Sequence, residues 1–453
     1  MNIVVVGCGK IGTAIISSLI REGHDITAVD LEENVLSQLG NIYDIMTVQG
    51  NGVDSDVLDE AGAGKADLFV SVTDSDEYNM LGCFLAKRMG AKHTIARIRR
   101  PEYNDKSLAF IKQNLELSRI INPELLAAQE IFNLIKFPSA MKIETFSTRK
   151  FEMIEMKLKN ESVLDGVALK NLRQKYKAKV LICAVQRDEK TVIPDGNFVL
   201  KSGDRIEIAA APIEIQKFLK ELGAFKKQAR KIMMVGGSKI SHYLADMLIG
   251  TGNDVKIIEV KKETCEDLAV DIPKAEIIEG NGTKHEVLVE EGIDTMDAFI
   301  ALTGIDEENI LISIFAEQRK VPSVISKIND DELAAIAERL GVDCTITPSR
   351  IVSNEIIQYA RAINIKLGSA VKTMYQIMDG QAEALEFGAT LDSKCIDIPL
   401  KHLPIQDNIL LVGLVRNRKT IVPSGDDTIM PGDSVIVVAA GHKLGKLDDI
   451  LEW

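Results

Sequence analysis

Long apolar runs, clustered cysteines and an excess of basic residues are all missing from this chain of 453 residues. No apolar stretch approaches the roughly 18 residues that a membrane-spanning helix needs, and the N-terminus begins with a strand-like pattern rather than a signal peptide. The six cysteines are widely separated and form no CxxC pair, which predicts reduced thiols in the cytosol and no zinc site. The net charge of −13 argues against a nucleic acid partner.

The overall composition is typical of a folded protein with several domains. Apolar residues make up 46% of the chain, a normal share for globular proteins, and the length predicts two to four domains. An internal repeat divides the chain. NIVVVGCGKIG, from Asn2, returns as KIMMVGGSKIS, from Lys231, and SVTDSDEYN, from Ser71, returns as ALTGIDEEN, from Ala301. Because further motifs repeat in the same order, we interpret the sequence as a tandem duplication.

The first copy opens with a glycine motif that predicts nucleotide binding. A β-branched run leads into Gly7-x-Gly9-x-x-Gly12, and a helical pattern follows at once. In this context the glycines permit a tight turn and the approach of a pyrophosphate, and the helix N-terminus offers unpaired N–H groups. Asp30 ends the next predicted strand, at the spacing of an acid that binds a ribose diol and repels a 2′-phosphate. The motif favours NAD(H) or an adenine nucleotide over NADP(H). The alternative is a glycine-rich turn that binds nothing.

Each half is predicted to contain two domains. The first part of each half alternates strands with helices, which predicts an α/β fold with a Rossmann-like, doubly wound parallel sheet. A helix follows, starting at Pro123 with Asn122 as its cap and, in the second copy, at Pro348. The helix is apolar almost all round, so we expect it to cross to a neighbouring domain and hold a dimer together, or else to be a central core helix.

The second part of each half changes character and predicts a small α+β domain. In the first copy its strands are expected near 151–158, 179–187, 190–193 and 205–210, with room for a bulge in the first of them, and a helix at 213–221 closes the domain. The same unit is expected again at the C-terminal end of the chain. The four predicted domains are 1–138, 139–225, 230–363 and 364–453.

Recognisable catalytic patterns are absent from the sequence. It contains no G-x-S-x-G, no H-E-x-x-H and no G-x-x-x-x-G-K-[ST], and His402 and His442 have no counterpart in the first copy. A dehydrogenase needs a proton-transfer group near the nicotinamide, and none is evident. A duplicated nucleotide motif without such chemistry predicts a sensor rather than an enzyme. An NAD-dependent oxidoreductase, or a nucleotide-binding scaffold unrelated to transport, are the alternatives.

These motifs resemble the RCK, or KTN, domains that regulate potassium transport. The resemblance covers essentially the whole chain and rests on VVVGCGKIG with Asp30, VTDSDEYNM, ARIRRPEY and the small domain that follows. It implies a regulatory, nucleotide-sensing subunit that binds NAD(H) and/or ATP/ADP. It also implies self-association through the crossover helices into a homotetrameric ring. Such a ring lies in the cytoplasm, peripheral on the inner face of the cell membrane, and gates a membrane potassium-transporting subunit of the TrkH/TrkG type.

The same resemblance assigns site residues in the first copy. Phosphates are expected at the glycine loop, a ribose at Asp30, and ribose and adenine beside the end of the fourth strand. Arginines at the end of the fifth strand are expected to contact phosphates, to which a guanidinium is well suited. The alternative is a basic strand end paired with nearby acids. The candidates are Gly7, Cys8, Gly9, Lys10, Ile11, Gly12, Asp30, Thr73, Asp74, Arg97 and Arg99.

The second copy departs from this pattern. Gly9 and Gly12 are replaced by Ser238 and Ser241, and Lys327 stands in the place of Arg97. A serine at the second glycine narrows the room for a pyrophosphate, so we expect this site to be weaker, altered in ligand choice, or empty. Its candidates are Gly236, Gly237, Ser238, Lys239, Ile240, Glu259, Thr303 and Lys327. No catalytic residue and no metal site are predicted.

Overall fold

The computed structural model describes the chain in two compact units. It covers residues 1–453 except 101–102, 104, 137–139, 147–149, 160–161, 224–228, 343, 365–370 and 453. One unit combines Met1–Phe132 with Ala229–Ala360, and the other combines Asn133–Gln228 with Arg361–Trp453. The predicted boundaries at 138–139 and at 225 lie outside the described residues, and the division into four domains stays a prediction.

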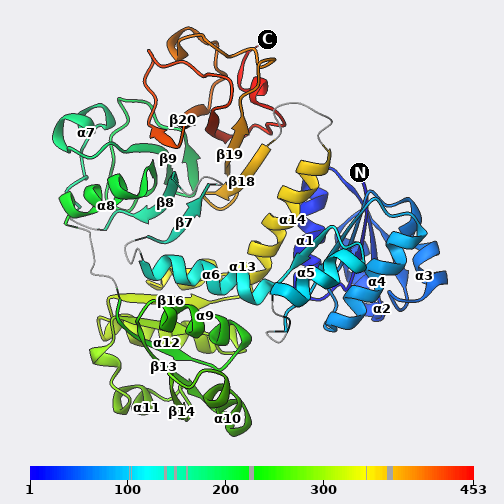
Figure 1. The fold of residues 1–453 in the computed structure, drawn as a ribbon. Coiled ribbons are helices and arrows are strands. Elements are labelled where there is room, and N and C mark those ends of the chain that lie inside the picture. The colour runs from blue at the N-terminus through cyan, green and yellow to red at the C-terminus, as the bar shows by residue number, and fades with distance from the viewer. Residues whose placement is uncertain are drawn as a thin grey trace. The chain divides into compact units, whose positions relative to one another are not determined.

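The first unit begins with a six-stranded parallel sheet, drawn in blue and cyan in Figure 1. Strands β1 and β4 are completely or almost completely buried, as expected for parallel strands covered by helices on both faces. The spatial order places β1 beside both β2 and β4, so the chain reverses direction across the sheet at β1. In spatial order the strands are β3 (Met46–Gln49), β2 (Asp25–Asp30), β1 (Asn2–Val6), β4 (Leu68–Ser71), β5 (His93–Arg97) and β6 (Arg119–Ile121).

Helices connect these strands, and a further helix follows the last strand. The sequence pattern predicts five strands, near 2–7, 25–30, 44–48, 67–72 and 93–98, and all five are present as β1 to β5, whereas β6 is an additional strand that the pattern did not predict. The carboxyl ends of β1 and β4 open a crevice at the reversal of strand order, where ligands bind in doubly wound folds. The helices are α1 (Lys10–Arg21), α2 (Glu33–Ile42), α3 (Ser55–Glu60), α4 (Asp76–Met89), α5 (Asp105–Asn114) and α6 (Pro123–Lys136).

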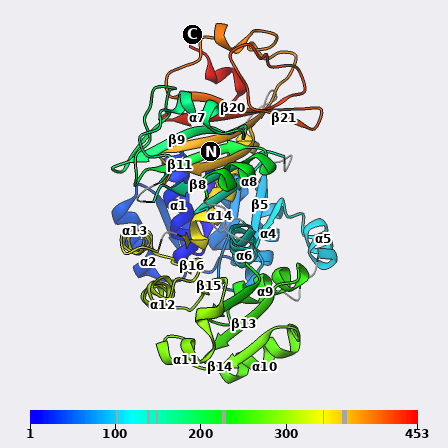
Figure 2. The same ribbon diagram turned by 90° about the vertical axis from the view of Figure 1, so that its left-hand side faces the viewer.

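The second half of this unit repeats the same topology, shown in green in Figure 2. Its strands, in spatial order, are β14 (Glu276–Glu279), β13 (Asp254–Glu259), β12 (Lys231–Val235), β15 (Ala298–Ala301), β16 (Ser323–Lys327) and β17 (Thr345–Ile346). Its helices are α9 (Lys239–Gly250), α10 (Lys262–Asp271), α11 (His285–Glu290), α12 (Asp306–Gln318), α13 (Asp331–Arg339) and α14 (Pro348–Asn364). The predicted doubly wound fold, present twice, is therefore confirmed.

The two parallel sheets of this unit are joined by contacts between the halves. The Asn122 amide donates to the Tyr243 hydroxyl at 3.0 Å, and that hydroxyl donates to the backbone oxygen of Arg99 at 3.1 Å. Arg119 at the start of β6 forms an ion pair with Glu355 of α14. The helix that opens at Pro348 thus packs against the first half within one chain. Its predicted role in holding two chains together stays a prediction.

The second unit contains two small antiparallel sheets with the same strand order. The first is β10 (Lys190–Val192), β9 (Leu181–Arg187), β11 (Arg205–Ala210), β8 (Glu152–Lys157) and β7 (Lys142–Thr145). The second is β21 (Lys419–Ile421), β20 (Ile409–Arg416), β22 (Ser434–Ala440), β19 (Ala382–Gly388) and β18 (Val371–Ile377). Side chains from both sheets, among them Met153, Ala384 and Val438, share one buried core.

Two details of the small domains differ from the sequence-based expectation. The bulge lies between β9 and β11, where the register shifts at Glu207/Ile208, while β8 pairs regularly with both of its neighbours. The predicted closing helix is present in the first copy as α8 (Pro212–Glu221), together with α7 (Leu169–Lys175). In the described part of the second copy short 3₁₀ turns stand in these places, at Leu400–His402 and Leu447–Ile450.

Charged side chains are buried in the first small sheet. Glu155 of β8 and Glu207 of β11 stand directly opposite each other, and both are almost fully buried. The Nε of Arg205 donates to Glu155 at 2.6 Å, and its Nη1 donates to Gln186 at 3.0 Å and to Asp379 at 2.6 Å. Burial raises the pKa of Glu155, against the opposing effect of Arg205. Burial, followed by the charges of Glu155 and Glu144, raises the pKa of Glu207 well above its usual range.

Candidate functional site

The glycine loop between β1 and α1 adopts the geometry of a phosphate-binding turn. Gly7 has φ +91°, and a Cβ there would lie 2.8 Å from the backbone nitrogen of Thr73. At Gly12 a Cβ would lie 1.8 Å from the Gly7 carbonyl oxygen, so glycine alone fits this loop conformation. Gly9 caps α1 without a side-chain hydrogen bond, and nothing lies within 4 Å of the place of its Cβ. The loop therefore leaves open space beside uncapped helix N–H groups.

Asp30, at the end of β2, is held by two backbone groups. The Cys8 N–H donates to one carboxylate oxygen at 2.5 Å, and the Glu32 N–H donates to the other at 3.0 Å. These bonds orient the carboxylate toward the loop and leave it capacity for further donors, such as ribose hydroxyls. The Cys8 side chain is buried away from the pocket, and burial, then the charge of Asp30, raises the pKa of its thiol to about 12. Cys8 thus contributes its backbone only.

The end of β4 is organised by Asn79, a fully buried residue of α4. Its amide oxygen accepts from the Thr73 N–H and the Thr73 hydroxyl, both at 2.8 Å, and from the Ser71 hydroxyl at 3.0 Å. Its nitrogen donates to the backbone oxygens of Thr73 and Arg97, both at 3.0 Å. One side chain therefore ties the ends of β4 and β5 to the same helix.

Asp76, at the first position of α4, completes this arrangement. Its buried carboxylate accepts from the backbone N–H groups of Arg99 and Arg100, both at 3.0 Å. Asp306 and Asn309 repeat the backbone contacts of both residues in the second half. The sequence-based prediction missed these four residues, although they occupy matching places in the repeated VTDSDEYN and LTGIDEEN motifs.

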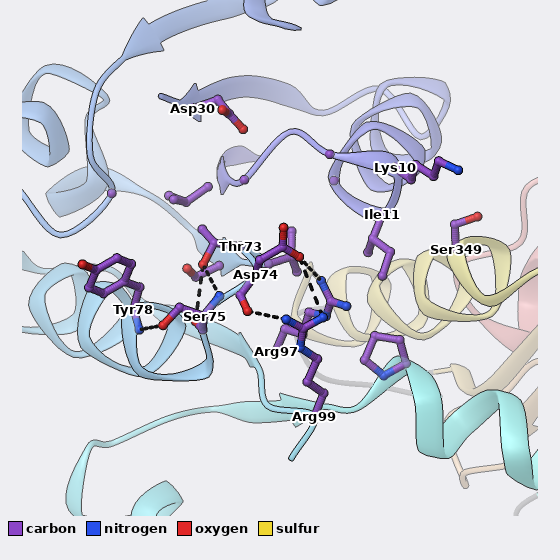
Figure 3. A pocket seen from close by; sticks show the side chains of 18 of the residues that line it. Lys10, Ile11, Asp30, Thr73, Asp74, Ser75, Tyr78, Arg97, Arg99 and Ser349 are labelled. Atoms are coloured by element: carbon purple, nitrogen blue, oxygen red, sulfur yellow. Dashed lines mark hydrogen bonds and ion pairs between the residues drawn. The ribbon is translucent and has the colours of Figure 1, made fainter. Parts of the chain in front are cut away.

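Arg97 and Arg99 point from the end of β5 toward the crevice, as Figure 3 shows. Arg97 lies 3.2 Å from Glu124 at the start of α6 and 3.7 Å from Asp74, and Arg99 lies 3.8 Å from Asp74 and 3.9 Å from Asp76. The two arginines are therefore paired with nearby acids, which is the alternative that the sequence left open. Asp74 is 97% exposed, so it is a weak partner. The Arg97 Nε is buried and has no hydrogen-bond partner among the residues that the structure describes.

A pocket of about 1050 Å³ combines these groups. Asp30 and the end of β4 line it, together with residues of the second half and the start of α14, of which Figure 3 labels Ser349. The predicted first-copy residues that line it are Gly7, Gly9, Lys10, Ile11, Gly12, Asp30, Thr73, Asp74, Arg97 and Arg99. Pro123 and Glu124 also line it and were not predicted as site residues.

The predicted second-copy residues divide into two groups. Ser238, Lys239, Ile240 and Lys327 line the same pocket, whereas Gly236, Gly237, Glu259 and Thr303 do not. Glu259 nevertheless repeats the contacts of Asp30, since it accepts from the N–H groups of Gly237 at 2.5 Å and Lys261 at 2.8 Å. The two predicted sites thus contribute to one pocket that opens on the crevice of the first half.

Lys327 brings a cation of the second half to this pocket. Burial lowers the pKa of its ammonium group, Asp306 opposes that shift, and Lys10 of the first-half loop adds to it. No hydrogen bond or ion pair within 4.0 Å joins Lys327 to another side chain of the described residues. Two ammonium groups from different halves therefore face the same space, which favours an anion between them.

These residues fit a nucleotide. An uncapped helix N-terminus, a buried and unsatisfied guanidinium nitrogen and two facing ammonium groups suit phosphates, and a carboxylate at the end of β2 suits a ribose diol. Within the described residues no group of three or more His, Cys, Asp and Glu side chains is arranged to hold a metal ion. The duplicated fold and this pocket define a class of proteins, those with tandem Rossmann-like domains for nucleotide binding.

Family models identify the group within this class. The TrkA-N domain model matches residues 3–123 and 232–348, and the TrkA-C domain model matches residues 153–223 and 385–452. The chain belongs to the TrkA family.

Named relatives and solved structures agree with this assignment. The Trk system potassium uptake protein TrkA homolog of Archaeoglobus fulgidus is 31% identical over 99% of this chain and 100% of its own length. The TrkA protein of Haemophilus influenzae is 28% identical, covering 98% and 96%. The GsuK RCK domain has a TM-score of 0.62 at 15% identity, covering 97% of this chain and 92% of its own. The GsuK channel bound to NAD has a TM-score of 0.61 at 15% identity, covering 97% and 77%.

Proposed function

We propose that this protein is the regulatory, nucleotide-sensing subunit of a potassium uptake system. The full-length similarity to proteins named Trk system potassium uptake protein supports the transport role. The pocket supports the sensing role, because its phosphate loop, its ribose acid and its arginines come from one half and its opposite wall comes from the other. The proposal depends mainly on one observation, namely that a chain of the TrkA family contains this pocket between its two Rossmann-like halves.

The ligand of the pocket is NAD(H), ATP or ADP. One similar solved structure is a GsuK channel bound to NAD, and another is GsuK bound to ADP. In our assignment the loop from Gly7 to Gly12 holds phosphates through its N–H groups, and Asp30 holds the ribose. Thr73 and Asp74 lie beside the ribose and adenine, and Arg97, Arg99 and Lys327 supply positive charge to the phosphates.

Regulation follows from competition for the arginines. Arg97 contacts Asp74 and Glu124, and Arg99 contacts Asp74. A phosphate attracts the same guanidinium groups, so its binding changes the contacts of the end of β5 and of the start of α6. A ligand shifts such an equilibrium only by its different affinity for the two arrangements. We propose that this change passes through a ring of RCK domains in the cytoplasm to a TrkH/TrkG-type membrane subunit.

Titration calorimetry tests the site. We expect ATP, ADP, NAD or NADH to bind the full chain, and Arg97→Ala to weaken binding of the nucleotide by about 10- to 100-fold, the range for lost charged hydrogen bonds. Lys217→Ala, in a half-exposed ion pair of α8, is the matched control and leaves affinity unchanged. Equal affinity in the Arg97 variant would refute the site.

Co-purification tests the transport role. The protein is expected to be retained by a potassium-transporting membrane subunit in detergent, and the binding nucleotide is expected to change potassium flux in vesicles that hold both proteins. Nicotinamide turnover with a small substrate would instead favour the oxidoreductase alternative.

In the described part of the chain no helix is both long enough and apolar enough to cross a membrane.

A further inference from the structure

The two phosphate loops satisfy their helix N-termini differently. In the first half, Gly9 caps α1 without any side-chain hydrogen bond. In the second half, Ser238 caps α9, and its hydroxyl accepts from the Ser241 N–H at 3.4 Å. The two serine hydroxyls lie 3.1 Å apart, and that of Ser241 donates to the Gly236 carbonyl oxygen. The second loop therefore forms internally some of the hydrogen bonds that a phosphate would form.

The serines also change the space inside the loop. In the first half the chain closes so tightly that a Cβ at Gly12 would lie 1.8 Å from the Gly7 oxygen. The equivalent position in the second half carries the Ser241 side chain, hydrogen-bonded across the loop to Gly236. The second loop thus holds a side chain where the first loop has no room for a Cβ, and Ser238 carries a side chain at the position of Gly9, beside which the first loop is open.

The surrounding charges differ in the same direction. Lys327 replaces Arg97, so a point charge stands where the first half has the guanidinium fork that suits a polyphosphate. Lys327 lines the pocket that opens on the first crevice, where it faces Lys10. The charge of the second half is therefore directed at the ligand of the first half.

We propose that each chain binds a single nucleotide, in the first half, and that Ser238 and Ser241 disable the second site. The second half serves as the wall of the first site and not as a site of its own. This inference rests on the proposed function, because it assumes that the first half binds a nucleotide.

Calorimetric stoichiometry separates the two ideas. With ATP and with NADH as the titrated ligands, we expect one bound molecule per chain for the ligand that binds. Two molecules per chain would overturn the single-site inference and leave the proposed function intact. If none of ATP, ADP, NAD and NADH bound, the proposed function would fall instead.

A matched pair of variants locates the bound nucleotide. Asp30 and Glu259 occupy equivalent positions and accept the same two kinds of backbone N–H. Asp30→Ala is expected to lower affinity by about 10- to 100-fold, and Glu259→Ala is expected to leave it unchanged. The opposite result would place the ligand in the second half and overturn the inference.

A gain of binding tests the role of the serines. Ser238→Gly combined with Ser241→Gly restores the glycine pattern, and we expect the stoichiometry to rise above one molecule per chain. Adding Asp30→Ala to this double variant weakens the first site, so that the remaining binding reports on the restored second site. Adding Glu259→Ala as well is expected to abolish that remaining binding. A well-folded double variant, with an unchanged melting curve, that still binds one molecule would overturn the assignment to these serines. If that variant unfolds, Ser238→Gly alone provides the same test.

Discussion

Removing Arg205 is expected to destabilise the second unit more than the loss of any surface ion pair. Arg205 is the cation beside Glu155, and the side chains of both are mostly buried, with 13% and 3% exposed. In Arg205→Met the carboxylate of Glu155 would remain in the sheet, opposite Glu207 and without its guanidinium. Breaking a buried pair in this way costs about 3–5 kcal/mol.

The magnitude can be checked by calorimetry on the full chain. A unit of roughly 150–250 residues loses about 2–4 °C of melting temperature per kcal/mol, so the transition of this unit is expected to fall by about 6–20 °C. Lys217→Met removes an exposed partner of Glu214 and should cost less than about 1 kcal/mol.

A double-mutant cycle identifies the cause. If the cost comes from the stranded carboxylate, Glu155→Gln combined with Arg205→Met should recover much of the lost stability, with a coupling of about 0.5–3 kcal/mol. A loss below about 1 kcal/mol in Arg205→Met, the value for a solvated pair, would refute the reasoning.

Three further outcomes follow from single residues. Asn79→Leu should cost about 1–3 kcal/mol for each buried group it leaves unpaired and should weaken nucleotide binding, both measurable on one sample. Because the pKa of Glu207 is raised above about 4.5, its contribution to stability is present below that pH and is lost as pH rises toward the raised pKa. Denaturant unfolding should show Glu207→Gln removing this decline, and an unchanged pH profile would contradict it. Iodoacetamide at pH 8 should leave Cys8 unmodified, since its pKa is about 12, and should label the half-buried Cys344 first in peptide mapping.

The parts of the site that depend on local pattern could be predicted from the sequence. The glycine spacing defines a strand, a turn and a helix within a few residues, and Asp30 follows at the end of the adjacent strand. Parallel strands covered on both faces read as apolar runs, so the doubly wound sheet was predictable as well. Asn122, predicted as a cap, accepts from the Leu125 N–H at 3.0 Å.

Contacts between distant segments could not be predicted in this way. Glu124 meets Arg97 because α6 begins beside the end of β5, and Lys327 reaches the pocket because the two halves pack together. Neither contact can be predicted from the local periodicity of the sequence. Asp76 and Asn79 stand in a motif whose repetition was visible, yet their role depends on which backbone groups the fold places near them. The 3₁₀ turns at Leu400–His402 and Leu447–Ile450 show that repeated sequence need not repeat its helices.

The pocket takes both of its walls from one polypeptide. Residues before 125 supply the phosphate loop, and residues after 237 supply the facing side. Two separate chains would form such a pocket only above their dissociation constant, whereas tethered modules meet at an effective concentration of about millimolar, set by their linker. Dilution therefore does not separate the walls. The affinity of this chain for its nucleotide should accordingly be independent of protein concentration, even where any larger assembly of the protein has dissociated.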